Sequence, residues 1–305
     1  MNIKSSEKLV GRDSEFFKVR ACFQARRNVL LEGPVGVGKT HLALAVTSDL
    51  GLPVFRVDGD NRYSEQKLSG WFDPPTVIRK GFQAESFMPG PLVEAMKKGG
   101  ILFINELNRL PEGVQNILLP AIDERVIIIP RLGEIRAVDG FLVIATQNPK
   151  EFVATSHLSE AILDRFELIV LCYQNEEEEV DIVTKKFRAQ GFVQKTSEIL
   201  PIAAVKLVRL TREHPRVRRG ASVRAAVSIA LIGNILVRDG MVLKDAFLAA
   251  ALMALPTRIE LERESDSDQT AGQEVEALLK EWVDTIMNEL TSQQIDVKKK
   301  IILKR

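Results

Sequence analysis

A stretch in the first part of the chain has the residue types and spacing needed to bind phosphate. Gly33 to Thr40 read Gly-Pro-Val-Gly-Val-Gly-Lys-Thr, which fits the pattern G-x-x-x-x-G-K-[ST]. The glycines of such a loop let backbone N–H groups surround a polyphosphate, while Lys39 can reach the β- and γ-phosphates and the Thr40 hydroxyl can hold Mg²⁺. This phosphate loop, residues 33–40, therefore predicts a nucleotide site.

The segments on either side of the phosphate loop support this interpretation. Val29 to Leu31 is an apolar run typical of a buried strand, and His41 to Val46 has helical spacing. A helix that begins directly after the loop points its N-terminal end at the bound anion. A glycine-rich turn with only a structural role is the alternative. The residues predicted to contact the nucleotide here are Gly33, Pro34, Val35, Gly36, Val37, Gly38, Lys39, Thr40 and His41.

A second group of candidate residues follows the apolar run Ile101 to Ile104. Asn105 and Glu106 come directly after it, where nucleotide hydrolases usually carry Asp-Glu. Glu106 is placed to polarise the attacking water, and a solvated loop carboxylate is the alternative. Asn105 would order the metal through its water shell with an amide oxygen. Because the amide is uncharged, we expect this site to hold Mg²⁺ more weakly, with Thr40 and the phosphates still contributing.

The apolar run Phe141 to Ala145 ends in further polar residues, Thr146 to Asn148. Asn148 can hydrogen-bond to the γ-phosphate or to the attacking water, although an asparagine before Pro149 is also a common turn former. Ligands of parallel sheets bind at the carboxyl ends of the strands. The candidate residues all follow strand ends, which agrees with a phosphate site.

The wider pattern is that of an α/β protein. Between residue 28 and about 171, short apolar runs alternate with helical segments, which predicts a parallel sheet with crossover helices. Two segments interrupt the alternation: an insert over residues 70–90 and a β-hairpin over about 125–138. The expected strands are Val29–Leu31, Val54–Val57, Ile101–Ile104, Phe141–Ala145 and Leu168–Leu171.

The character of the chain changes near residue 174. Asn175 and Glu178 have the spacing of a capping box, so a helix is expected to begin there. Near the C-terminus an amphipathic helix is expected over about 274–290. The predicted regions are an α/β nucleotide domain over 1–174, a helical lid over 175–260, and an acidic linker, amphipathic helix and basic tail over 261–305.

Composition narrows the classes of function. The chain of 305 residues is 45% hydrophobic, enough for a sizeable core, and its net charge of +1 gives no general attraction to nucleic acid. The two cysteines, Cys22 and Cys172, have no metal or redox spacing. Neither a signal segment nor an apolar stretch long enough for a bilayer is evident, so we expect a cytoplasmic protein.

Taken together, these residues resemble the AAA+ ATPases, and specifically the MoxR-like group, which is close to the magnesium-chelatase and CbbQ/NirQ types. The motifs occur in the family's order and span residues 9 to about 255. The resemblance implies a P-loop nucleotide domain of three layers, with a parallel sheet, followed by an all-helical lid. The matching stretches are Val10–Arg12, Gly33–Thr40, Met88–Leu92, Asn105–Arg109, Ala145–Pro149, Leu163–Phe166 and Gly220–Arg224.

The resemblance also implies individual roles. Thr40, and Asn105 through water, would hold the metal, and Val10 and Gly11 fall where the family contacts adenine. Arg224 would contact the nucleotide as well. In the family, the insert over 70–90 (helix-2 insert) and the hairpin over 125–138 (pre-sensor-1 hairpin) face a central pore. The implied catalytic residues are Lys39 of Walker A, Glu106 of Walker B, Asn148 as sensor 1, Arg165 as arginine finger and Arg224 as sensor 2.

ATP and Mg²⁺ are the cofactors that the resemblance implies, and a homo-oligomeric ring, a hexamer, is the implied assembly. Arg165 of a neighbouring subunit would then stabilise the charge of the transition state. The output would be the remodelling or maturation of a client protein, in this family often one with a von Willebrand factor A domain.

Two other functions remain open. Asn105 either belongs to a lineage that tolerates asparagine or is a substitution that traps bound nucleotide. With this residue, the protein could instead be an ATP-binding assembly module with slow or no hydrolysis. A nucleic-acid motor is the other. An arginine cluster could serve it, but without interleaved aromatic residues a solvated face or subunit contact is favoured. The cluster comprises Arg209, Arg212, Arg216, Arg218 and Arg219.

Overall fold

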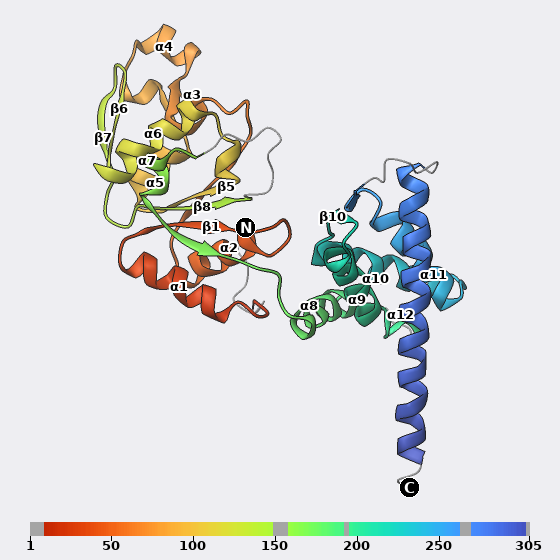
Figure 1. The fold of residues 1–305 in the computed structure, drawn as a ribbon. Coiled ribbons are helices and arrows are strands. Elements are labelled where there is room, and N and C mark those ends of the chain that lie inside the picture. The colour runs from red at the N-terminus through yellow and green to blue at the C-terminus, as the bar shows by residue number, and fades with distance from the viewer. Residues whose placement is uncertain (1–8, 149–157, 192–194, 263–269, 303–305) are drawn as a thin grey trace. The chain divides into compact units, whose positions relative to one another are not determined.

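The computed structural model describes residues 9–148, 158–191, 195–262 and 270–302 of the chain. The chain forms two compact units, residues 1–173 and 174–305. Figure 1 shows an α/β arrangement in the first unit and helices in the second. Within the described residues, no helix is both long and apolar enough to cross a membrane.

A five-stranded parallel sheet forms the centre of the first unit. Its strand order is β2-β5-β8-β1-β9, and all four neighbouring pairs are parallel. The predicted parallel α/β sheet is therefore confirmed, and each expected apolar run overlaps one of these strands. The strands are β1 (Asn28–Glu32), β2 (Val54–Asp58), β5 (Ile101–Asn105), β8 (Leu142–Gln147) and β9 (Phe166–Val170).

Both faces of this sheet are covered by helices, which gives the unit three layers (Figure 1). On β5, Ile101 and Phe103 enter one core and Leu102 and Ile104 enter another, and all four are fully buried. Burial on both faces explains why this strand reads as a continuous apolar run. The covering helices are α1 (Asp13–Gln24) and α2 (Lys39–Asp49) on one face and α5 (Pro91–Lys98) and α6 (Glu112–Asp123) on the other.

The insert over 70–90 has a defined structure. Its two strands pair antiparallel, with Gly70 opposite Pro89, and Phe72 packs edge-on against Phe82 and Phe87 with ring centroids 5.1 and 5.3 Å apart. None of the residues of α4 is buried. The helix α3 (Glu65–Ser69) precedes the insert, whose elements are β3 (Gly70–Phe72), α4 (Pro74–Lys80), η1 (Ala84–Ser86) and β4 (Phe87–Pro89).

The second interruption is the expected β-hairpin. Strand β6 (Val126–Ile129) pairs antiparallel with β7 (Gly133–Arg136). The Arg131 guanidinium, in the turn of this hairpin, lies 3.9 Å from the ring centroid of Phe82 in the insert. The hairpin and the insert are therefore in contact with each other.

Helices dominate the second unit and share one apolar core. The capping box at its start is present: the Asn175 side chain accepts from the Glu178 backbone, and the Glu178 side chain accepts from the Asn175 backbone. A stretch expected to be helical throughout also holds a short antiparallel ribbon of β10 (Val217–Arg219) and β11 (Glu260–Leu261). The helices are α8 (Glu176–Arg188), η3 (Lys195–Ser197), α9 (Leu200–Glu213), α10 (Val223–Arg238), α11 (Leu243–Ala254) and α12 (Ala271–Ile302).

The C-terminal helix differs from what the sequence led us to expect. Helix α12 extends over Ala271–Ile302 rather than 274–290, so the basic tail at Lys298–Lys300 continues the helix. It packs against α9 and α11, and Leu279, Trp282 and Val283 are buried in the core of the second unit. Because apolar residues recur along it at three- and four-residue spacing, one face can join this core. The helix is part of the second unit and not a separate C-terminal region.

Truncating Trp282 tests this integration of α12. The Trp282 side chain is only 7% exposed and packs edge-on against His214 of the same unit, with ring centroids 5.2 Å apart. We expect Trp282→Ala to lower the free energy of unfolding by about 3–5 kcal/mol, since it leaves a cavity. Urea unfolding followed by circular dichroism measures the loss. The neighbouring exposed residue serves as control, and Glu281→Ala should change stability by less than about 0.5 kcal/mol. Equal, small effects would show that α12 is not part of the core.

Candidate nucleotide-binding site

The phosphate loop connects β1 to α2 and depends on its glycines. Gly33 has a φ of +154°, and a Cβ there would lie 2.2 Å from the backbone oxygen of Leu171. Gly38, the N-cap of α2, adopts a left-handed conformation with a φ of +95°. Side chains at these positions would be strained or would clash. Because the glycines carry none, the loop backbone can approach a phosphate closely.

Lys39 and Thr40 form the first turn of α2, directly after the loop. The Lys39 ammonium donates to the backbone oxygens of Gly33 and Pro34 at 2.6 and 2.9 Å, so the side chain folds back over the loop. His41 is exposed at the third position of the helix. The helix is anchored on its other side by the buried residues Leu42, Ala43 and Val46.

A hydrogen-bonded cluster joins the phosphate loop to the ends of two strands. The Asn105 side-chain oxygen accepts from the hydroxyls of Thr40 and Thr146, each at 3.1 Å. The Thr146 hydroxyl in turn accepts from the backbone N–H of Glu106 at 2.9 Å. These residues come from α2, β5 and β8, and Thr146 is fully buried. Their meeting point agrees with the position predicted from the strand ends.

The Asn105 amide has one further partner, Asp58 at the end of β2. Asn105 Nδ2 donates to Asp58 Oδ1 at 3.1 Å. The Arg56 side chain also donates to this carboxylate, at 2.7 to 3.1 Å. Mainly through the hydrogen bonds from Arg56, the pKa of Asp58 is lowered below its ordinary value. We did not predict Asp58 from the sequence, although it follows an expected strand.

Glu106 adopts an unusual backbone conformation beside this cluster. Its φ of 61° is left-handed, which is uncommon for a residue other than glycine. The carboxylate does not point freely into solvent: it accepts from Arg109 Nη1 at 2.8 Å within the short helix η2 (Leu107–Arg109). Left-handed strain at a strand tip is a feature that clusters at functional sites.

Asn148 follows β8 and is buried, with 7% of its surface exposed. Its backbone oxygen accepts from the Asn108 side chain at 3.4 Å, and Asn108 is buried as well. Asn148 therefore lies at the same edge of the sheet as Asn105 and Thr146. Pro149, the last residue of the motif, lies outside the described residues.

Arg165 lies between α7 (Glu160–Leu163) and β9 and is engaged within its own subunit. Its Nε donates to Asp123 Oδ2, at the end of α6, at 2.6 Å, and its Nη1 donates to the backbone oxygen of Ala161. Among the described residues, Arg165 makes no hydrogen bond or ion pair with the phosphate loop.

Arg224 belongs to the second unit, where it is the second residue of α10 and is exposed. It makes no ion pair with any residue that the structure describes.

Val10 and Gly11 form a turn before α1, with Gly11 at a φ of 64°, in the first unit. The structure thus brings Lys39, Thr40, Asn105, Glu106 and Asn148 to one edge of the sheet.

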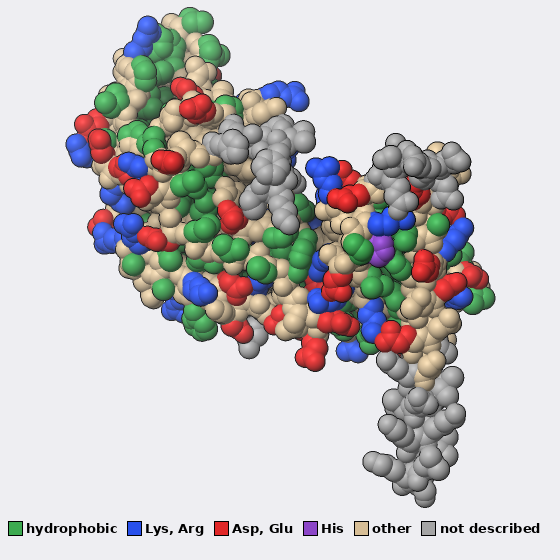
Figure 2. Space-filling model, viewed as in Figure 1, with side chains coloured by type: hydrophobic (Ala, Val, Ile, Leu, Met, Phe, Trp, Pro, Cys, Tyr) green, Lys and Arg blue, Asp and Glu red, His purple; other side chains and the backbone are tan. Residues whose placement is uncertain are grey.

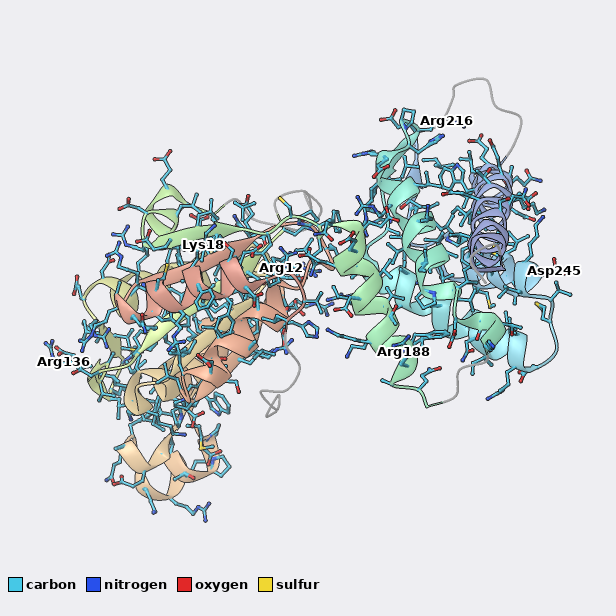
Figure 3. The ribbon with its side chains drawn as sticks, turned by 90° about the horizontal axis from the view of Figure 1, so that it is seen from below. Arg12, Lys18, Arg136, Arg188, Arg216 and Asp245 are labelled. Atoms are coloured by element: carbon cyan, nitrogen blue, oxygen red, sulfur yellow. The ribbon has the colours of Figure 1, made fainter. Side chains whose placement is uncertain are left out.

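Arg12 clamps the phosphate loop, a role that sequence reasoning missed. It lies at the start of α1 (Figure 3) and is only 5% exposed. One amino group, Nη2, donates to the backbone oxygens of Val37 in the loop and Cys172 after β9, at 2.9 and 2.5 Å. The other, Nη1, donates to Glu15 at 2.7 Å. The sequence marks Arg12 only as part of a motif, because nothing in it reveals the burial.

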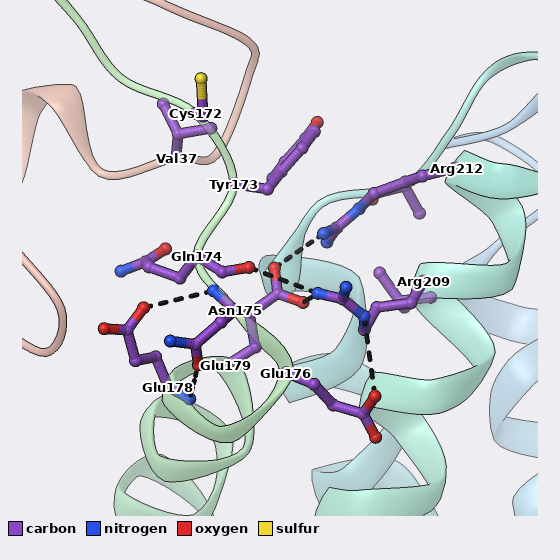
Figure 4. Close-up of polar contacts among 12 residues, drawn as sticks. Val37, Cys172, Tyr173, Gln174, Asn175, Glu176, Glu178, Glu179, Arg209 and Arg212 are labelled. Carbon is purple, nitrogen blue, oxygen red and sulfur yellow. Dashed lines mark hydrogen bonds and ion pairs between the residues drawn. The ribbon is translucent and has the colours of Figure 1, made fainter.

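The arginine cluster of the second unit is largely paired. Figure 4 shows the buried Glu179 carboxylate between Arg209 and Arg212, at 3.4 and 2.7 Å. Arg209 also donates to the backbone oxygen of Gln174 at 3.3 Å. Ion pairs hold Arg216 to Glu274 and Arg218 to Glu260. On the face drawn in Figure 2, acidic and basic side chains are interspersed. Four of the five arginines of the cluster are therefore paired with acidic residues among the described residues, which favours a structural role for them.

The fold and the loop together define the class of this protein. A parallel sheet of this kind, with a phosphate loop between β1 and α2 and a helical unit after it, is the fold of AAA+ P-loop ATPases. A solved RuvB mutant from Thermotoga maritima has a similar fold, with a TM-score of 0.54 and 17% identity over 82% of this chain and 72% of that chain. NtrX from Brucella abortus, solved in complex with ADP, has a TM-score of 0.54 and 17% identity over 90% and 62%.

Sequence comparison gives the family. Residues 28–166 match the family described as "AAA domain (dynein-related subfamily)". An uncharacterised protein of Staphylococcus epidermidis is 31% identical over 237 residues, which cover 76% of this chain and 86% of that protein. The chain belongs to the same family as this relative, and its first unit carries an AAA domain of the dynein-related subfamily. Membership of the MoxR-like group stays a prediction.

Removing the Arg12 clamp should destabilise the first unit. In Arg12→Ala the Val37 and Cys172 oxygens lose their donor and Glu15 loses its partner, so we expect the free energy of unfolding to fall by about 1–3 kcal/mol. Nucleotide affinity should fall too, since the loop is then held less firmly. Thermal unfolding and titration with a fluorescent ATP analogue measure the two effects. Arg20→Ala removes an exposed arginine of the same helix, which pairs with Asp49 at 3.6 Å, and should change neither. If the two variants behave alike, Arg12 is not a clamp.

Proposed function

We propose that this protein is a MoxR-like AAA+ ATPase, which binds ATP with Mg²⁺ and hydrolyses it at the boundary between subunits of a ring. One observation carries the proposal: the Thr40 hydroxyl of the phosphate loop and the Thr146 hydroxyl both contact the Asn105 amide oxygen at 3.1 Å. ATP hydrolysis needs three groups in one place: a metal-binding hydroxyl, a group that orders metal-bound water, and a carboxylate such as that of the adjacent Glu106.

Binding of ATP would begin at the phosphate loop. Lys39 would exchange the backbone oxygens of Gly33 and Pro34 for oxygens of the β- and γ-phosphates, which carry full negative charge. The backbone N–H groups of the loop and the N-terminal end of α2 would surround the same phosphates. Val10 and Gly11, in the turn before α1, would lie against the adenine.

The residues around Asn105 fit Mg²⁺. The side-chain atoms that could bind a metal here are oxygen atoms of the Thr40 hydroxyl, the Asn105 amide and the Asp58 carboxylate. Mg²⁺ prefers oxygen ligands and keeps several of its waters. Thr40 would be a direct ligand, and Asn105 would accept a hydrogen bond from a metal-bound water. When bound, Mg²⁺ neutralises the charge of the β- and γ-phosphates.

Glu106 would orient the attacking water and accept its hydrogen bond. In the resting structure its carboxylate is held by Arg109, at 2.8 Å. This exposed pair must open, which costs about 1 kcal/mol or less. The Asn148 side chain, at the end of the next strand, would fix the γ-phosphate or the water from the other side.

Two arginines would complete the site in the assembled ring, which we propose is a hexamer. Arg165, released from Asp123, would reach the nucleotide of the neighbouring subunit, and Arg224 of the helical unit would contact the γ-phosphate. Both guanidinium groups would stabilise the charge that spreads over the phosphoryl oxygens. Hydrolysis would thereby depend on assembly.

The work of the ring would be to remodel a client protein, for example one with a von Willebrand factor A domain. Apolar side chains on the insert and on the hairpin support this part of the proposal, because such surfaces bind other proteins. Ile78 of the insert is 86% exposed and Ile128 of the hairpin is 77% exposed. Trp71 and Met88, on the paired strands of the insert, are 45% and 49% exposed.

Replacing Glu106 separates binding from hydrolysis. We expect Glu106→Gln to lower steady-state ATP turnover about 10²- to 10⁴-fold, since the amide cannot accept the proton of the attacking water. Affinity for a fluorescent ATP analogue should stay within about twofold of the parent protein, because the carboxylate is not part of the phosphate loop. Unchanged turnover would show that Glu106 is not the water-activating residue.

The same assay decides between an ATPase and a passive ATP-binding module. Asn105→Asp restores the usual carboxylate. A parent protein that turns over ATP in a Mg²⁺-dependent way, at a rate equal to or above that of Asn105→Asp, is a competent ATPase. If the parent is inert and only Asn105→Asp turns over, the protein is an assembly module that binds ATP without hydrolysing it.

Mixing inactive variants tests whether Arg165 acts on a neighbouring subunit. We expect Arg165→Ala to lower turnover by about 10³-fold or more, and Lys39→Ala to abolish nucleotide binding. A mixture of the two should regain activity, since a Lys39→Ala subunit can offer its Arg165 to the intact site of its neighbour. Arg27→Ala, which removes an exposed arginine paired with Glu167, is the control and should remain active. A mixture that stays inactive would contradict catalysis between subunits.

A further inference from the structure

The metal site proposed for this chain lacks a charge at the end of β5. Asn105 stands where the Walker B strand of P-loop ATPases carries an aspartate, and its amide is neutral. A carboxylate nevertheless lies beside it, on the neighbouring strand. Asp58, the last residue of β2, is the register partner of Asn105, and Asp58 Oδ1 accepts from Asn105 Nδ2 at 3.1 Å.

The backbone fixes this carboxylate in place. Directly after β2, the Gly59 N–H donates to the Asn105 backbone oxygen at 2.7 Å. The two chains approach so closely that a Cβ on Gly59 would lie 2.1 Å from the Glu106 backbone oxygen. Asp58 therefore has little freedom to move away from Asn105.

Contact with Asp58 also determines which way the amide points. An ionised carboxylate can only accept hydrogen bonds, so the NH₂ group of Asn105 must face Asp58. The amide oxygen is thereby turned toward Thr40 and Thr146, whose hydroxyls donate to it at 3.1 Å. In the reverse orientation the Asn105 amide oxygen would face the Asp58 carboxylate. The NH₂ group would then face Thr40 and the metal.

We propose that Asp58 replaces the missing Walker B carboxylate: it supplies the negative charge of the metal site and holds the Asn105 oxygen toward the metal. This inference rests on the proposed binding of ATP with Mg²⁺. Asp58 acts here as a positioning residue behind Asn105, in the way that outer partners orient the groups around a metal.

Arg56 forms an ion pair with the Asp58 carboxylate but does not cancel its negative charge. The two side chains are 47% and 58% exposed, and an exposed ion pair of this kind is weak in water. The carboxylate thus remains available to attract a cation at the neighbouring site. If its charge is what matters, removing Arg56 and removing Asp58 must act on metal binding in opposite directions.

The test is the Mg²⁺ dependence of nucleotide binding, measured with a fluorescent ATP analogue in the full-length protein. For Asp58→Asn we expect the Mg²⁺ concentration at half-effect to rise about 10- to 100-fold, the usual consequence of losing an outer partner of a metal site. Affinity for the analogue in EDTA should stay at the parent value, because the phosphate loop is untouched. A loss of affinity that is equal with and without Mg²⁺ would mean a merely structural role and would overturn the inference.

Three further variants sharpen this test. Asp58→Asn combined with Asn105→Asp moves the charge to the usual strand and should restore the parent Mg²⁺ midpoint to within about threefold, well inside the 10- to 100-fold loss of the single variant. Arg56→Gln should shift the midpoint to lower Mg²⁺. Asp60→Asn makes the same chemical change two residues away, in a turn where the Asp60 side chain accepts from the Arg62 backbone N–H, and should shift nothing. Failure of the double variant to recover, with Asp58→Asn impaired, would show that charge is not the cause.

The inference and the proposed function fail in different ways. A parent protein that binds no ATP analogue at any Mg²⁺ concentration contradicts the proposed function itself. A parent that binds with clear Mg²⁺ dependence, while Asp58→Asn has the same midpoint, leaves the ATPase proposal intact and refutes the role of Asp58.

Discussion

Parallel pairing of the strands is the constraint on which the candidate site depends. Each strand ends at the same edge of the sheet, so residues that are far apart in the sequence become neighbours there. Asp58 and Asn105 are 47 residues apart and Thr146 follows Asn105 by 41, yet their side chains form one hydrogen-bonded cluster. A slip of one residue in the register of β5 would turn Asn105 to the opposite face of the sheet, because side chains alternate along a strand. The slip would also exchange Ile101 and Phe103 with Leu102 and Ile104 between two close-packed cores, where side chains of different shape fit poorly.

Three charged residues of the candidate site are engaged within the subunit. Lys39 is held by backbone oxygens of its own loop, Glu106 by Arg109 and Arg165 by Asp123. These contacts lie at the protein surface, where individual ion pairs contribute about 1 kcal/mol or less. A nucleotide phosphate or a neighbouring subunit can therefore displace them at small cost. Under the proposed function, ATP and a neighbouring subunit would both have to displace these contacts before the site becomes active.

The sequence predicts those parts of the structure that local patterns determine. Continuous apolar runs located all five strands of the sheet, and the spacing of Asn175 and Glu178 located the start of α8. Contacts made only in the folded protein could not be predicted in this way. The burial of Arg12 depends on the Cys172 backbone, 160 residues away, and the partnership of Asp58 with Asn105 depends on the order of the strands. Likewise, α12 was expected to be separate from the lid because residues 261–272 read as a polar linker, and its packing against α9 and α11 is made only in the folded protein.

Asparagine at the end of β5 has a physical consequence beyond the loss of a charge. An aspartate at this position would meet the Asp58 carboxylate at the distance where the Asn105 amide now donates to it, and two carboxylates so close cannot both ionise without a penalty. An amide avoids that repulsion and converts the contact into a hydrogen bond. Asn105 and Asp58 are in this sense a matched pair, in which one strand provides an oriented oxygen and the other provides the charge. Restoring the usual aspartate at position 105 therefore does not simply repair a defective site. An aspartate at position 105 can take over the charge of the site only when Asp58 gives up its own.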